Sequence, residues 1–331
     1  MPFAFFSPLA VVYYTGEDIG TFKKESGAWM DENQLLNEMV YILDQDGAEA
    51  AYAFLCDGEP DVDGDNKIQL YNFLTCLAAV CGRSEEALEW LEEALVIQGL
   101  WYRPETFDDP DLEPLFGLER YENFRRLSLA RFQEANAQAR PLVYGPLGPQ
   151  TSPKLAAVFH GDFQTGNQAL HQWGFLTDLG WRLAAIQSGE LAACGLYRWT
   201  PTGDGPEQVA SCLPQLGWDQ ARPRLLAGFG SGCDVLLRGL DLGLFSTERL
   251  ILVAPLSPYG ERNAQAIQES LAAQGCRVLV LCGQEDEDCS DLAEALTQGE
   301  PGENWQIRWI PQLAHALPEN RMELVRDWIA D

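Results

Sequence analysis

The sequence predicts an all-α domain followed by an α/β domain with a mainly parallel sheet. Apolar residues recur at helical spacing over the first 140 residues, whereas short apolar runs alternate with helical patterns after about residue 150. A segment rich in proline and glycine, residues 140–149, separates the two patterns and is typical of a linker. Alternating strands and helices indicate a parallel sheet with helices on both faces. We therefore expect a helical domain at residues 1–140 and an α/β domain at residues 141–331.

Composition argues against several classes of partner. Of the 331 residues, 46% are hydrophobic, an ordinary value for a protein with a core. The net charge is −28 and both predicted domains are acidic, so no basic surface is evident for nucleic acid or anionic lipid. The apolar residues 1–14 lack a basic region and are too short to span a membrane, so we expect no membrane partner. Nine scattered cysteines, an odd number, favour free thiols and a cytoplasmic location.

The first domain is predicted to consist of paired helices. Apolar spacing and helix-breaking residues predict helices at residues 32–43, 48–55, 68–80 and 85–98. Within the last pair, aromatic, leucine and small residues recur at packing positions: Tyr71, Leu74, Ala87, Leu91 and Ala94. On these residues, the segment from Ile68 to Ala139 resembles a tetratricopeptide repeat, which implies a protein partner. A small helical bundle with the same spacing is the alternative.

The second domain is predicted to alternate strands and helices. Strands are expected at residues 142–144, 155–159, 183–186, 225–227, 250–253, 278–281 and 307–310. Helices are expected near residues 167–179, 207–216, 232–240, 262–274, 290–298 and 319–330. Binding and catalytic residues of such sheets lie in the loops at the carboxyl ends of the strands. Four of these loops contain histidine, serine or acidic residues, which could take part in catalysis.

These four loops carry motifs in a defined order along the chain. They are His160-Gly-Asp162, Leu226-Ala-Gly-Phe-Gly-Ser-Gly-Cys233, Gly283-Gln-Glu-Asp286 and His315-Ala-Leu-Pro318. From Lys154 to Asp331, the chain resembles the α/β-hydrolase superfamily, in particular small carboxylesterases and phospholipase-type esterases. In that family the serine follows a sharp strand–turn–helix elbow, and the acid and the histidine come later in the chain. The resemblance implies an α/β-hydrolase-like sheet and a small acyl-ester substrate.

The resemblance also implies a role for each loop. His315 would be the general base, and Asp286 would orient its ring and stabilise its charged form. Glu285, Glu287 and Asp288 compete with Asp286 for that role, because the whole loop is acidic. Gly161 and Asp162 would shape the oxyanion hole, with the N–H of Asp162 as one donor and the N–H of the residue after the nucleophile as the other.

The elbow departs from the family pattern at its central position. With Gly228 and Gly232 as the small flanking residues, the nucleophile position is Gly230, which has no side chain. Ser231 follows one residue later, but its flanking residues would then be Phe229 and Cys233. Three interpretations remain open: a shifted turn with Ser231 as nucleophile, a degenerate site, or chemistry without a protein nucleophile in which His315 activates water. Glycine tolerates the strained elbow conformation at least as well as serine.

No cofactor or metal is expected from the sequence. The stretch Asp61-Val-Asp63-Gly-Asp65 begins like a calcium loop, but Asn66 and Asn72 occupy the positions that require glycine and glutamate. Two function classes follow. One is a serine esterase or thioesterase that acts through Ser231, Asp286 and His315. The other is a catalytically degenerate hydrolase fold that binds or scaffolds, with the helical domain as an interaction module.

Overall fold

The computed structural model describes residues 32–59, 67–297 and 304–330. The apolar residues 1–14 and the calcium-like stretch 61–65 lie outside these ranges. The chain forms two compact units, one of residues 1–138 with 193–195 and the other of residues 139–192 with 196–331. Each unit is described by itself. The domain boundary expected from the sequence, at residue 140, stays a prediction.

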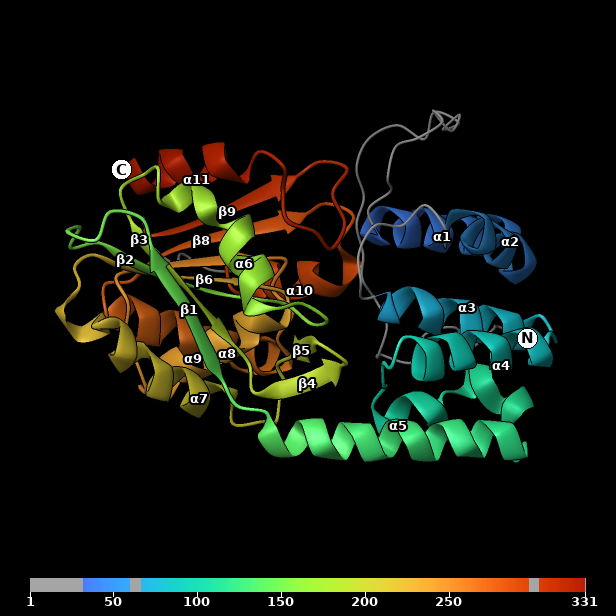
Figure 1. Ribbon diagram of the computed structural model, residues 1–331. Helices are drawn as coiled ribbons and strands as arrows, with labels where there is room; N and C mark the ends of the chain where they lie inside the picture. The colour runs from blue at the N-terminus through green and yellow to red at the C-terminus, as the bar shows by residue number, and fades with distance from the viewer. Residues whose placement is uncertain (1–31, 60–66, 298–303, 331) are drawn as a thin grey trace. The chain divides into compact units, whose positions relative to one another are not determined.

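The first unit is helical, as the spacing of its apolar residues predicts. Its helices, labelled in Figure 1, are α1 (Glu32–Asp46), α2 (Ala48–Gly58), α3 (Ile68–Val80), α4 (Ser84–Glu92) and α5 (Glu119–Gln138). A π-helical turn, η2 (Glu93–Ile97), continues α4, and two short 3-10 helices, η3 (Pro104–Asp108) and η4 (Pro110–Leu115), precede α5. Neighbouring helices α1 and α2, and α3 and α4, pack as pairs.

Small residues allow the second helix pair to pack closely. Leu74, Ala87 and Ala94 are fully buried, and Leu91 is nearly so. The sequence predicts that these four residues pack between the two helices of the pair. Their burial fits any tightly packed helical hairpin, so the tetratricopeptide identity stays a prediction. The α-helix predicted to reach residue 98 ends at Glu92, where the π-helical turn replaces it.

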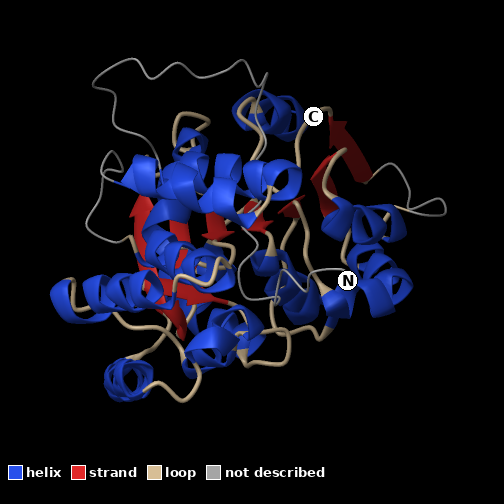
Figure 2. Cartoon of the chain, turned by 90° about the vertical axis from the view of Figure 1, so that its right-hand side faces the viewer, coloured by secondary structure: helices blue, strands red, loops and turns tan. Residues whose placement is uncertain are grey.

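The second unit is built on a seven-stranded sheet. Its strands are β1 (Leu142–Leu147), β2 (Leu155–Phe159), β3 (Arg182–Gln187), β6 (Arg224–Phe229), β7 (Arg249–Val253), β8 (Arg277–Gly283) and β9 (Trp305–Ile310). The order across the sheet is β1-β3-β2-β6-β7-β8-β9, and every neighbouring pair is parallel except β1 and β3. Figure 2 shows the strands in red with blue helices on both sides. The predicted mainly parallel sheet is therefore present.

Helices cover both faces of this sheet. In Figure 1, α11 (Arg321–Ala330) lies above the sheet, and α7 (Gly205–Cys212), α8 (Ser231–Asp241) and α9 (Pro258–Ala273) lie below it. Helix α6 (Gly166–Gln172) packs on β1, β2 and β3, and α10 (Glu287–Ala295) packs on α9. Strands β2 and β6 are buried along their whole length, as expected for central parallel strands. No helix in the described part of the chain is both long and apolar enough to cross a membrane.

The order of the strands reverses at β2 and β6. The chain passes from β2 to β3 on one side, whereas β6 pairs with β2 on the other side. In open α/β sheets, the point at which the strand order reverses opens a crevice that takes ligands. The sequence did not predict the separate hairpin β4 (Glu190–Ala193) and β5 (Leu196–Arg198), which is closed by a turn with Gly195 at positive φ.

Candidate active site

The turn after β6 has the backbone conformation of a nucleophile elbow, and its centre is Gly230. This residue has φ 53° and ψ −123°, values that side-chain-bearing residues rarely adopt, and α8 begins at the next residue. The Gly230 N–H donates to the carbonyl of Val253 at 3.1 Å, which ties the turn to the neighbouring strand β7. Glycine reaches this conformation at the least cost.

The glycines at positions 228 and 232 fix the centre of the turn at residue 230. A Cβ atom on Gly228 would lie 3.0 Å from the backbone of Gly232. A Cβ atom on Gly232 would lie 2.6 Å from the carbonyl oxygen of His160. These close approaches explain why the positions two before and two after residue 230 hold glycine.

Asp286 and His315 meet at the carboxyl ends of β8 and β9. The Asp286 Oδ2 atom lies 3.2 Å from His315 Nδ1, and the side chains are 1% and 13% exposed. The other carboxylate oxygen of Asp286 accepts a hydrogen bond from the N–H of Cys289 at 3.2 Å, which caps α10. The competing acids Glu285, Glu287 and Asp288 are exposed. Among the described acidic residues of this loop, Asp286 is the one that reaches His315.

A glycine allows the two loops to approach each other. A Cβ atom on Gly283, the last residue of β8, would lie 1.9 Å from the carbonyl oxygen of Leu313. Backbone–backbone bonds then join the loops, with the Glu285 N–H donating to the same Leu313 carbonyl at 3.0 Å. Gly283, the glycine of the Gly283-Gln-Glu-Asp286 motif, is therefore needed to bring Asp286 to the histidine loop.

The second ring nitrogen of His315 faces the centre of the elbow. A Cβ atom built on Gly230 would lie 3.2 Å from His315 Nε2. The His315 ring also packs against Phe229, with the ring centroids 5.1 Å apart. A hydroxyl carried by residue 230 would thus start from a Cβ atom beside the imidazole nitrogen that a general base uses.

The hydroxyl of Ser231 points toward Asp162 and not toward His315. It donates to Asp162 Oδ1 at 2.7 Å, and Ser231 is 5% exposed. Among the described residues, no hydrogen bond joins Ser231 to His315. Asp162 Oδ1 also accepts the N–H of Trp199 at 3.2 Å. The carboxyl group of Asp162 is therefore engaged by two donors.

Asp162 as a whole is exposed, but its carboxyl oxygen Oδ1 is in contact with Ser231 and Trp199. Desolvation raises the pKa of Asp162 above the ordinary aspartate value, against the hydrogen bonds from Ser231 and Trp199 and the nearby charges of Arg198 and His315. A raised pKa makes this carboxyl a better proton acceptor than an ordinary aspartate. Asp162, which contacts the Ser231 hydroxyl, is therefore a second candidate base beside His315.

The loop after β2 approaches the elbow and carries the N–H of Asp162, one of the two N–H groups expected as oxyanion donors. A Cβ atom on Gly161 would lie 2.8 Å from the Phe229 ring, so glycine is needed for the loop to approach the elbow. The Gly161 N–H donates to Gln164 Oε1 at 3.0 Å. For the N–H groups of Asp162 and Ser231, no acceptor is recorded among the described residues. Their role as oxyanion donors stays a prediction.

His160 is a structural residue of this loop. It is fully buried, and burial lowers its pKa to about 4, so the ring is neutral near pH 7. Its Nε2 atom accepts the Ser188 N–H at 3.0 Å, so Nδ1 carries the proton and donates to the Gly161 carbonyl at 2.7 Å. The Trp199 indole donates to the His160 carbonyl at 3.0 Å. His171, expected in a helix, lies in α6.

Cys289 was not singled out from the sequence. Its Sγ atom lies 3.2 Å from His315 Nδ1, the nitrogen that also contacts Asp286. One potential ligand atom from each of Asp286, Cys289 and His315 lies within 4.8 Å of the others, so these three residues could hold a metal ion. Burial and the charge of Asp286 raise the pKa of the Cys289 thiol, which favours its protonated form. The spacing of three residues from Asp286 along a helix was the signal available in the sequence.

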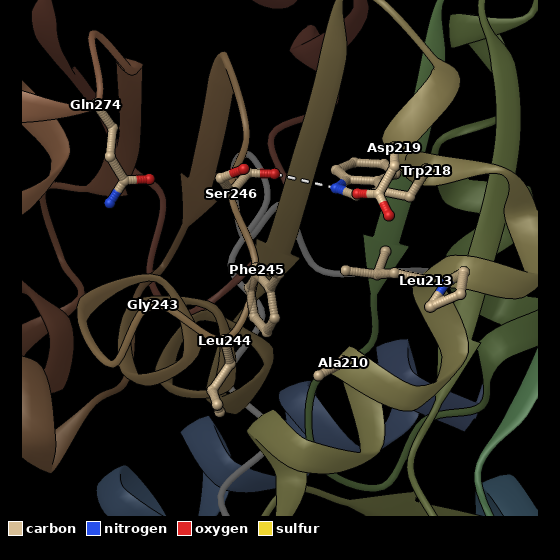
Figure 3. Close-up of a pocket in the computed structure, with 10 residues that line it drawn as sticks. Ala210, Leu213, Trp218, Asp219, Gly243, Leu244, Phe245, Ser246 and Gln274 are labelled. Carbon is tan, nitrogen blue, oxygen red and sulfur yellow. Dashed lines mark hydrogen bonds between the residues drawn. The ribbon is translucent and has the colours of Figure 1, made fainter.

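A separate cavity of about 450 Å³ lies at the opposite edge of this unit (Figure 3). Its wall includes Leu213, Trp218 and Phe245, and the Trp218 indole donates to the Ser246 carbonyl at 3.0 Å. These residues precede β6 and β7 in the chain, so the cavity lies near the amino ends of those strands. It is distinct from the candidate active site at their carboxyl ends.

The chain is similar to one protein family over its helical unit and to several solved structures. Residues 31–136 match a protein family described as A/B hydrolase-like, N-terminal domain. An uncharacterized protein from Bacillus cereus ATCC 10987 is 25% identical over 91% of this chain and 98% of its own, with a TM-score of 0.50. Esterase PE8 is 16% identical, over 58% and 97% of the two chains, with a TM-score of 0.45. No curated protein sequence matches this chain significantly.

A ligand-bound structure is also among the similar proteins. Est1E from Butyrivibrio proteoclasticus, solved with ferulic acid, is 13% identical over 57% of this chain and 92% of its own, with a TM-score of 0.42. The strand order and the family match define the class of this protein. It has an α/β-hydrolase-like fold, with a mostly parallel sheet and flanking helices, preceded by a helical region similar to the A/B hydrolase-like N-terminal domain.

Proposed function

We propose that the α/β unit binds a small acyl compound at the carboxyl ends of β2 and β6 and does not form a covalent acyl intermediate with it. In this proposal the protein is a catalytically degenerate member of the hydrolase class. The observation that carries the proposal is the position of His315 Nε2, which lies 3.2 Å from a Cβ atom built on Gly230. The residue beside the candidate base is a glycine, which has no atom that can attack a carbonyl.

The environment of Ser231 supports the same conclusion. Acyl transfer requires the hydroxyl proton to pass to a base while the oxygen bonds to the carbonyl carbon. The Ser231 proton is directed at Asp162, 2.7 Å away, and not at the His315–Asp286 pair. If the turn shifted so that Ser231 stood at its centre, Gly228 and Gly232 would no longer flank the centre, and the close backbone approaches at these two glycines would be lost. The remaining donors, the N–H groups of Asp162 and Ser231, suit hydrogen bonding to a ligand oxygen.

Two substitutions at Gly230 test this proposal. Gly230→Ser restores a hydroxyl beside His315, and Gly230→Ala adds the same backbone strain and the same Cβ atom without the hydroxyl. We expect hydrolysis of short-chain p-nitrophenyl esters to rise by roughly 10- to 100-fold in Gly230→Ser, the scale of a positioned general base, and not in Gly230→Ala. Efficient hydrolysis by the wild type, with loss of activity in Gly230→Ser, would contradict the proposal.

A serine esterase with Ser231 as its nucleophile is the second candidate, with Asp162 in place of the expected His315–Asp286 pair as the base beside it. One observation favours it: the Ser231 hydroxyl already donates to a carboxyl group whose pKa is raised, so Asp162 could accept its proton. Ester hydrolysis by the wild type that is lost in both Ser231→Ala and Asp162→Asn would support this alternative. The helical unit is proposed as an interaction module in either case.

A further inference from the structure

The helical unit contains a pocket of about 450 Å³ that has no role in the proposed acyl site. Its wall combines three aromatic rings and four carboxylates with the side chain of Cys56. The rings are Tyr52 of α2, Tyr71 of α3 and Trp90 of α4. The carboxylates belong to Glu59, Glu86, Glu89 and Glu93. Aromatic faces and carboxylates together are the groups that recognise organic cations.

The aromatic rings are held in place by their own contacts. Tyr71 and Trp90 stack with ring centroids 6.2 Å apart and an angle of 26° between the planes. The Trp90 indole N–H donates to the Tyr52 hydroxyl at 3.0 Å, and that hydroxyl donates to Glu86 at 2.9 Å. Tyr52 and Tyr71 are 3% and 4% exposed. The wall is therefore already ordered in the absence of a ligand, which lowers the entropic cost of binding.

The charge of the pocket is not balanced by its neighbours. Lys67 pairs with Glu59 at 2.9 Å, and Arg83 pairs with Glu86 at 3.5 Å. The Gln98 amide donates to Glu93 at 2.7 Å, which satisfies an oxygen but adds no positive charge. Glu89 is exposed and has no recorded ion-pair or side-chain partner among the described residues. Four carboxylates thus face two cations, so the pocket keeps an excess of negative charge that a further cation would reduce.

The unit already places one of its own cations on an aromatic ring of this pocket. The Arg83 guanidinium lies over the Tyr52 ring, 5.2 Å from its centroid, and also pairs with Glu49 at 2.8 Å. This contact shows that Tyr52 with adjacent glutamates accommodates a guanidinium. Because Arg83 satisfies Glu86 and Tyr52, the part of the pocket beside Trp90 and Glu89 is the part left for a ligand.

We propose that this pocket binds an organic cation, an alkylammonium or guanidinium group, against Trp90 and Glu89. The group belongs either to a small molecule or to a lysine or arginine side chain of a partner, and the chemistry of recognition is the same for both. The affinity should fall with added salt because part of the attraction is between charges at a solvent-exposed site.

Nuclear magnetic resonance of the full chain provides a direct test. The indole N–H signal of Trp90 is assigned by its loss in Trp90→Phe and then followed during titration with choline, with butylguanidinium and with a short lysine- and arginine-containing peptide. The neutral isostere of choline, 3,3-dimethylbutan-1-ol, and a peptide with norleucine and citrulline in place of the basic residues are the matched ligand controls. We expect the Trp90 signal to shift with the cations and not with the neutral ligands.

Charge variants separate this proposal from nonspecific attraction to an acidic protein. Glu89→Gln should weaken cation binding by about two- to fivefold, the scale of one exposed charge or cation–aromatic contact. Glu85→Gln is the matched control, since Glu85 lies on the same helix, is exposed and does not line the pocket. Arg83→Gln should strengthen binding, because it removes a competing cation.

The two titration arms identify the source of the cation. A shift with the free cations alone identifies a small molecule, a shift with the basic peptide alone identifies a protein partner, and a shift with both shows that the pocket accepts the cation from either source. Absence of a Trp90 shift in both arms would overturn the proposal. Equal weakening by Glu85→Gln and Glu89→Gln, or equal binding of the neutral ligands, would also overturn it.

Discussion

The two halves of the candidate active site differ in how their side chains are used. After β8 and β9, the buried Asp286 pairs with the partly exposed His315, whose second ring nitrogen faces the elbow. After β2 and β6, the hydroxyl of Ser231 is bound to Asp162, and the position beside the imidazole is Gly230. In both halves, glycines allow two backbone segments to lie in close contact. The packing of the fold thus maintains the shape of an elbow whether or not residue 230 carries a nucleophile.

Gly283→Ala should have the largest effect, because it breaks the half that holds Asp286 and His315. The added Cβ atom would lie 1.9 Å from a backbone oxygen that cannot move as a flexible side chain can. We expect the free energy of unfolding to fall by about 3 kcal/mol or more, measured by urea titration. Gly174→Ala is the matched control, since no atom lies within 4 Å of its Cβ position and it should change stability by less than about 1 kcal/mol. Equal stability of the two variants would show that the fold does not depend on the close contact between Gly283 and the backbone of the histidine loop.

Acid should destabilise the folded protein through His160, which lies in the half of the site after β2. The pKa of His160 is lowered to about 4 in the folded protein, below the ordinary histidine value of about 6.5. The unfolded chain therefore binds a proton that the folded protein rejects as the pH falls through this range. Stability contributed by neutral His160 is fully present above about pH 6.5 and is lost progressively toward pH 4, by up to about 3 kcal/mol.

Histidine resonances give the measurement for this prediction. We expect one of the three histidine signals, removed in His160→Gln, to remain neutral down to about pH 5. Unfolding of His160→Gln should depend less on pH between 7 and 5 than unfolding of the wild type. A His160 signal that titrates near pH 6.5 would show that the ring is not buried as described.

Ser231→Ala should have the smallest effect. The substitution removes one side-chain hydrogen bond to a carboxyl group that keeps a second donor, the Trp199 N–H. We expect a loss of about 1 kcal/mol of stability, measured by thermal or urea unfolding. Asp162→Asn provides the comparison, because an amide oxygen in place of Oδ1 still accepts from both donors. A loss above about 3 kcal/mol for Ser231→Ala would assign the serine a larger structural role.

Much of this fold is predictable because its strands and helices carry strong local patterns. The expected strand at residues 155–159 coincides with β2, and the expected helix at residues 68–80 coincides with α3. The hairpin of β4 and β5 escaped prediction because its strands have four and three residues and carry little periodic signal. The helix expected at residues 167–179 ends at Gln172 and continues as a 3-10 turn.

The candidate site is less predictable, because its contacts join distant parts of the chain. The glycine spacing around residue 230 indicates the elbow, since the constraint is local. The hydrogen bond between Ser231 and Asp162 spans 69 residues, and no local pattern specifies it. The contact of Cys289 with His315 depends on how α10 packs against the histidine loop, which the sequence does not reveal. Catalytic roles for Ser231, Asp286 and His315 stay predictions.

Covalent labelling with a fluorophosphonate probe, read by intact mass and peptide mapping, tests the central claim most directly. We predict that the wild type is not labelled, that Gly230→Ser is labelled at residue 230, and that Gly230→Ser combined with His315→Gln is not. Gly230→Ala serves as the control for the added Cβ atom. Labelling of the wild type at Ser231, abolished by Ser231→Ala, would contradict the claim that the elbow lacks its nucleophile.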